Sequence, residues 1–90
     1  MTEDERIFAE FRQMFAEVTE DCLLVLQKHI AKGDSWKTCD INFLQRKVIE
    51  EFEEWRLDAE NRCNDQRELL DLINMCVMLL KRHERDERSK

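Results

Sequence analysis

The chain contains no proline, and Gly33 is the only glycine among its 90 residues. Proline and glycine are the residues that most often interrupt helices and form tight turns. Their scarcity, together with a charged-residue content of 40% that is rich in Glu, Lys and Arg, predicts an all-α fold. Apolar residues still make up 42% of the sequence, which argues against a disordered chain.

The sequence also lacks an apolar run long enough to cross a membrane, and no apolar signal region follows its charged start. Its four cysteines form no C-x-x-C pair, which argues against a zinc site of the usual spacing. These absences predict a reduced, cytoplasmic protein with no membrane partner. The formal net charge of −6 argues against nucleic acid as a partner, because a nucleic-acid-binding protein needs a basic face for phosphates.

The length predicts a single domain over residues 1–90. Helix boundaries within this domain follow from the apolar periodicity and from three residues, Gly33, Asp40 and Asp65. Glycine suits a helix C-terminus, and aspartate is a good N-cap. The expected elements are a long helix over about residues 1–32, a loop over 33–40, a helix over 41–60, a helix over 65–82 and a charged tail over 83–90.

The expected first helix has an apolar stripe whose spacings alternate between four and three residues, as in a coiled-coil seam. Phe8, Phe11 and Phe15 give this helix more aromatic surface than a three-helix monomer needs. A small chain buries a small fraction of its surface, and oligomerisation is a common remedy. The sequence therefore predicts a homo-oligomer whose contact is made by the first helix.

Two pairs of carboxylates stand at helical spacing, Glu51 with Glu54 and Glu68 with Asp71. Residues three apart on a helix share a face, so each pair presents both carboxylates on one side of its helix. Asp71 lies in a segment that is apolar nearly all round, which predicts a helix buried on several sides. If the two helices pack as a hairpin, the four carboxylates converge. Converging carboxylates either acquire raised pKa values or bind a cation, and Mg²⁺ prefers oxygen ligands.

Each part of this pattern also has a structural interpretation. Glu68 can be the capping-box partner of Asp65. The acidic run Glu50–Glu54 can be a solvated face that forms a helix ion pair with Lys47. Asp71 can be a polar interruption that fixes the register of its helix. The occurrence of both pairs at inward-facing positions favours the metal site.

The pattern E-x-x-E, thirteen residues, E-x-x-D resembles the motif of the all-α nucleoside triphosphate pyrophosphatases, and within them the MazG-like proteins. Asn74 also fits, because many MazG-like chains read D-x-x-N at this point. The segment Lys32-Gly-Asp-Ser-Trp36 resembles a loop that precedes the motif helix in small members. The resemblance covers about residues 32–80. It implies a helical hairpin completed to a four-helix core by homo-oligomerisation, as a dimer or a dimer of dimers.

The resemblance further implies Mg²⁺-dependent hydrolysis of an NTP or dNTP to the monophosphate and pyrophosphate. By match to the motif, the metal ligands would be Glu51, Glu54, Glu68 and Asp71. Glu54 or its neighbour Glu50 would act as the base for water. The substrate-binding candidates are Trp36 for stacking on a base, Lys47 for a phosphate and Asn74 for sugar or phosphate. The alternative function is a non-catalytic helical interaction or regulatory module that keeps the scaffold without the chemistry.

Overall fold

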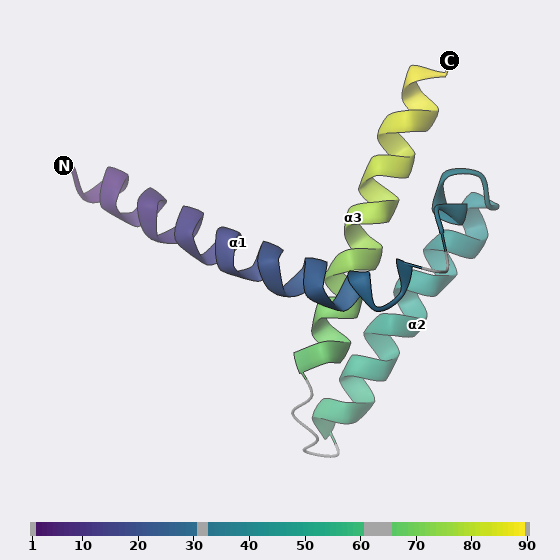
Figure 1. Cartoon of the computed structure of the whole chain (residues 1–90), viewed down its shortest axis with the longest axis horizontal. Helices are drawn as coiled ribbons and strands as arrows, with labels where there is room; N and C mark the ends of the chain where they lie inside the picture. Colours follow the sequence, from purple (N-terminus) through teal and green to yellow (C-terminus); the bar gives the residue numbers. More distant parts are fainter. Residues whose placement is uncertain (1, 31–32, 61–65, 90) are drawn as a thin grey trace.

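A computed structural model describes residues 2–30, 33–60 and 66–89 of the chain, without the side chains of residues 58 and 59. Within these ranges the protein contains helices and no strand, which confirms the all-α prediction (Figure 1). The elements are α1 over Glu3–Gln27, the short 3-10 helix η2 over Ser35–Lys37, α2 over Ile41–Glu60 and α3 over Gln66–Arg88.

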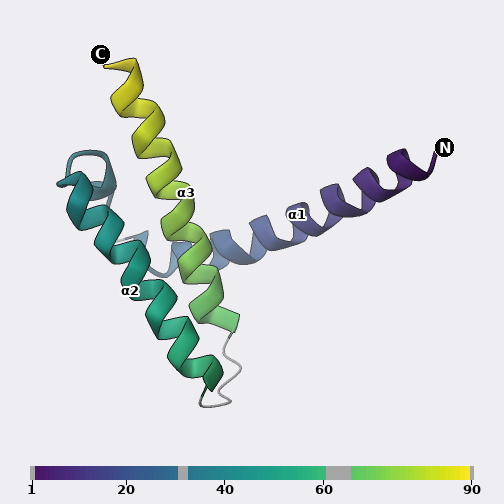
Figure 2. The same cartoon turned by 180° about the vertical axis from the view of Figure 1, so that it is seen from behind.

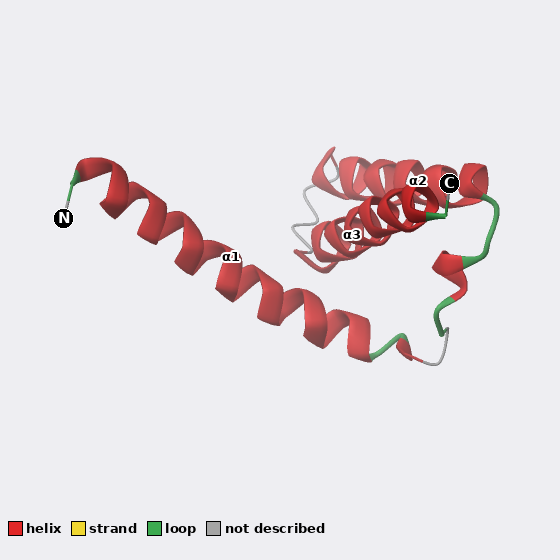
Figure 3. Cartoon of the chain, turned by 90° about the horizontal axis from the view of Figure 1, so that it is seen from above, coloured by secondary structure: helices red, strands yellow, loops and turns green. Residues whose placement is uncertain are grey.

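The centre of the molecule is an antiparallel hairpin in which α2 and α3 lie side by side (Figures 1 and 2). The C-terminal part of α1 packs against α3, where Cys22 and Val25 are buried. Asn74 of α3 fixes this crossing, because its side-chain Nδ2 donates a hydrogen bond of 3.1 Å to the carbonyl oxygen of Cys22. The N-terminal half of α1 extends away from the hairpin, as the view from above also shows (Figure 3).

The expected boundaries of α2 are confirmed. Asp40 caps this helix, since its carboxylate accepts a hydrogen bond of 2.7 Å from the backbone N–H of Asn42. The backbone oxygen of Asp40 also accepts the first helical bond, from Leu44 at 3.1 Å. Leu44 is the buried apolar anchor of α2, with 3% of its surface exposed. The expected cap at Asp65 lies outside the described residues.

The prediction that the first helix continues to about residue 32 is wrong, because α1 ends at Gln27. Its last turn tightens through bonds between residues three apart, from Lys28 N–H to Val25 oxygen at 3.2 Å and from His29 N–H to Leu26 oxygen at 2.9 Å. Gly33 then adopts a φ of 72°, a left-handed conformation that glycine accepts without steric cost.

The predicted charged tail over residues 83–90 is helical for most of its length, because α3 continues to Arg88. Oppositely charged side chains one turn apart stabilise this extension. The pairs are Arg82 with Asp86 at 3.0 Å, Lys81 with Glu84 at 2.9 Å and Arg88 with Glu84 at 2.6 Å.

Arg82 attaches the loop between α1 and α2 to α3. Its Nη1 donates to the carbonyl oxygens of Trp36 at 3.0 Å and Cys39 at 2.6 Å. Its side chain is only 12% exposed, so these bonds are partly shielded from water. The loop therefore carries η2 as a fixed element on α3, an arrangement that the sequence did not reveal.

The expectation that the third helix is buried on several sides is wrong for one chain, since no residue of α3 is fully buried. Only α2, η2 and the end of α1 pack on it, and its other face exposes Val77 and Leu80. The radius of gyration is 15.8 Å, whereas a compact chain of this length has about 12 Å. A single chain is therefore unusually extended and leaves much apolar surface uncovered. None of the described helices is long and apolar enough to cross a bilayer.

Candidate metal centre

Three of the four predicted metal ligands come together in the hairpin. Glu51 is contributed by the middle of α2, and Glu68 and Asp71 by the first turns of α3. One carboxylate oxygen of each side chain lies within 4.8 Å of the other two. The antiparallel packing of α2 on α3 produces this cluster, because it places the middle of one helix beside the start of the next. We call these three residues the acidic triad.

The acidic triad is half-buried, and both Glu51 and Glu68 have one carboxylate oxygen that is shielded from solvent. Oε2 of Glu51 is inaccessible to solvent and has no hydrogen-bond partner. Burial, which is the largest cause, and the negative charges of Glu54, Asp71 and Glu68 together raise the pKa of Glu51 from 4.5 to about 7.

The donor set fits a hard divalent cation. Mg²⁺ binds oxygen at 2.0–2.1 Å in an octahedron, which places neighbouring and opposite ligand oxygens about 3 to 4.2 Å apart. The oxygens of the triad lie within 4.8 Å of one another, which is close to this spacing. Three carboxylates leave further positions of an octahedral ion for water or phosphate. Such an all-oxygen set suits Mg²⁺, Mn²⁺ or Ca²⁺ better than it suits softer metals.

Glu54 and Glu50, the two candidates for the catalytic base, lie in different surroundings. Glu54 is exposed and outside the triad, yet it shares a side-chain hydrogen bond with Glu51 that contributes to the raised pKa of Glu51. Glu50 instead forms an ion pair of 3.1 Å with Lys47. This pair, rather than one between Lys47 and Glu51, is the helix ion pair that forms. Of the two candidates, Glu54 is the one beside the triad.

Of the other two substrate-binding candidates, Asn74 is engaged in a contact with α1 and Trp36 lies away from the triad. The side-chain amide of Asn74 donates to the backbone of α1, so its role here is to hold two helices together. Trp36 lines a cleft whose α3 residues begin at Lys81. Lys81 is ten residues beyond Asp71, which corresponds to about 15 Å along the helix.

Sequence analysis placed Arg82 at the end of the expected third helix without a role, and it missed Arg85 because residues 83–90 were expected to form a charged tail. The signal that could have found the helix was the alternation of opposite charges at spacings of three and four residues. Charge alternation alone does not show that Arg82 turns toward the loop, since that depends on where η2 packs.

No protein-family model, curated protein sequence or solved structure matches this chain significantly. Any functional assignment therefore depends on the spacing of the carboxylates in the sequence and on their geometry in the hairpin.

Without divalent cations, the protein should lose stability as the pH rises from about 5 to about 8. The pKa of Glu51 is higher in the folded chain, about 7, than its ordinary value of 4.5. Proton binding to Glu51 therefore stabilises the fold fully below about pH 4.5, and this contribution is lost as the pH rises through about 7. Melting temperatures in EDTA across this range should fall by several degrees, and excess Mg²⁺ should reverse the fall.

The matched control for this pH dependence is Glu51→Gln, which cannot titrate at that position. Its melting temperature should vary less between the same two pH values. An identical pH dependence in the variant and the parent would show that other groups cause the loss of stability.

Proposed function

We propose that this protein is a Mg²⁺-dependent nucleoside triphosphate pyrophosphohydrolase of the MazG-like type, which acts in the cytoplasm. It would convert an NTP or dNTP and water to the monophosphate and pyrophosphate. The observation that carries the proposal is the convergence of Glu51, Glu68 and Asp71 from two helices, with oxygens within 4.8 Å. The motif spacing in the sequence supports the same activity, and the free thiols of the described cysteines fit a reducing compartment.

The residues have distinct roles in this proposal. Glu51, Glu68 and Asp71 would hold Mg²⁺, which when bound neutralises negative charge on phosphate oxygens. Glu54, which is exposed and interacts with Glu51, would accept the proton of the attacking water. The water oxygen forms a bond to the α-phosphorus while the bond from that phosphorus to the α,β-bridging oxygen breaks. Pyrophosphate leaves, and the monophosphate remains.

We further propose that the active form is a homo-oligomer, a dimer or a dimer of dimers with a four-helix core. One chain has an accessible surface of 7546 Å², about 1,900 Å² more than a folded monomer of this size usually exposes. That excess is the scale of surface that an obligate interface buries. A second copy would also supply groups for the nucleotide base, because Trp36 lies far from the triad of its own chain.

The alternative is a non-catalytic helical module for interaction or regulation. The observation that favours it is the uncovered apolar face of α1, which includes Phe8 at 60% exposure and Phe15 at 70%. Such a face serves association and needs no metal. The two functions differ in whether the triad binds Mg²⁺ and whether nucleotide is consumed.

The test is pyrophosphate release from a panel of canonical and modified nucleoside triphosphates, each with Mg²⁺ and with EDTA. Release that requires Mg²⁺ and favours one or a few substrates supports the enzyme and identifies its base preference. If no substrate in the panel is hydrolysed and Mg²⁺ leaves the melting temperature unchanged, the interaction module is the better assignment.

A further inference from the structure

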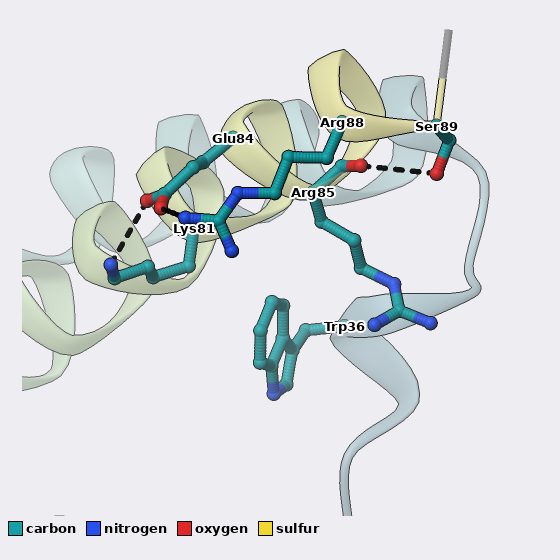
Figure 4. Close-up of a pocket in the computed structure, with 6 residues that line it drawn as sticks. All are labelled: Trp36, Lys81, Glu84, Arg85, Arg88 and Ser89. Carbon is teal, nitrogen blue, oxygen red and sulfur yellow. Dashed lines mark hydrogen bonds and ion pairs between the residues drawn. The ribbon is translucent and has the colours of Figure 1, made fainter.

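A cleft near the C-terminal end of α3 combines an indole with cationic side chains and lies apart from the acidic triad. It has a volume of about 400 Å³, which is in the range of small-molecule sites. Arg85 in this cleft is fourteen residues beyond Asp71, or about 21 Å along the helix. The lining residues, shown in Figure 4, are Trp36, Lys81, Glu84, Arg85, Arg88 and Ser89.

The wall that carries Trp36 is fixed before any ligand arrives. Arg82 binds the carbonyl oxygens of Trp36 and Cys39, and these bonds hold η2 against α3. Trp36 itself is half-buried, with the Nζ of Lys37 at 5.8 Å from the centre of its ring. A ligand that stacks on this indole would therefore lose little free energy in ordering the loop.

The opposite wall is positively charged. Lys81 and Arg88 both pair with Glu84, at 2.9 Å and 2.6 Å. Arg85 forms no ion pair with any residue in the described part of the chain, and its side chain reaches toward the loop that carries Trp36 (Figure 4). Three cations and one carboxylate give the cleft a local charge of +2 on a chain whose net charge is −6.

We propose that this cleft binds a mononucleotide, with the base stacked on the indole of Trp36 and the phosphate bound by Arg85. A guanidinium offers paired N–H donors that match phosphate oxygens, and indole rings stack on every nucleobase. Basic residues in a last helical turn also complement the helix dipole, but that role does not account for an indole held in the same cleft. The site is independent of the acidic triad and of the proposed hydrolysis.

Binding can be measured with the full chain carrying Trp55→Phe, so that Trp36 is its only tryptophan. Titration with AMP in EDTA should quench the fluorescence of Trp36 to saturation, and inorganic phosphate should bind more weakly because it has no ring to stack. Arg85→Gln should weaken AMP binding about tenfold or more. Glu84→Gln should tighten it, because Lys81 and Arg88 are then released from their shared carboxylate.

Arg46→Gln, which removes a positive charge from exposed surface of α2, is the matched control and should leave binding unchanged. Equal weakening by Arg46→Gln and Arg85→Gln, or no saturation at millimolar AMP, overturns the proposal. It is also overturned if Asp71→Asn abolishes binding, because the ligand then occupies the acidic triad. A change of assembly mass on Arg85→Gln would instead make the cleft a contact between copies.

Discussion

Glu51→Gln should lower Mg²⁺-dependent pyrophosphate release on the order of 100-fold or more. The substitution keeps the shape of the side chain but removes one of the three anionic donors of the triad. Asp71→Asn should have a similar effect, because it removes a donor from the facing helix. Both variants should keep their helical content and show a much smaller rise in melting temperature on adding Mg²⁺. Steady-state rates and thermal unfolding measure these effects.

Glu53→Gln is the matched control on the same helix. Glu53 forms an ion pair of 2.8 Å with Arg56 and is not part of the triad. The Glu53→Gln variant should stay folded, because exposed ion pairs contribute little to stability. Its rate of hydrolysis should therefore stay close to that of the parent protein. If Glu51→Gln and Asp71→Asn hydrolyse nucleotide at the rate of Glu53→Gln, the triad is not the active site.

The sequence predicted the clustering of the candidate metal ligands better than it predicted how the helices pack. The clustering depends mainly on short-range geometry. The spacing of Glu68 and Asp71 determines that they share one face of a helix, and the Asp40 cap sets where α2 begins. The packing of α2 against α3 then brings Glu51 to the same place. Each of these steps depends on short-range geometry, which periodicity and capping residues encode.

The features that the sequence did not predict depend on tertiary packing. Asn74 looked like a substrate ligand, yet its amide holds α1 on α3, which only the crossing of those helices determines. Trp36 looked like a base-stacking residue at the carboxylates. The bonds from Arg82 place it at the other end of α3 instead. Neither the crossing nor the attachment of the loop leaves a periodic signal.

The second large effect is expected at the apolar face of α1. Phe11→Glu should convert the proposed homo-oligomer to monomer and lower its melting temperature. Phe11 is 51% exposed in one chain, on the helix whose next turns bury Cys22 and Val25 against α3. Burying a Phe contributes about 1.5–3 kcal/mol, and a symmetric interface counts each residue twice. A carboxylate there should therefore weaken association more than 100-fold.

Sedimentation equilibrium of parent and variant measures this effect directly. Gln13→Glu adds the same charge at a polar position of α1 that hydrogen-bonds Glu17, and it should leave the assembly mass unchanged. The melting temperature of the parent should also rise with protein concentration, as mass action requires of an oligomer. A parent that sediments as a monomer at tens of micromolar would refute the oligomer.

The monomeric variant also separates metal binding from substrate binding. All three carboxylates of the triad belong to one chain, so a folded monomer should still gain thermal stability from Mg²⁺. Trp36, the candidate for stacking on the nucleotide base, is held at the distant cleft of that chain. Phe11→Glu should therefore retain a response to Mg²⁺ while losing hydrolysis. Full activity in the monomer would mean that one hairpin is a complete active site.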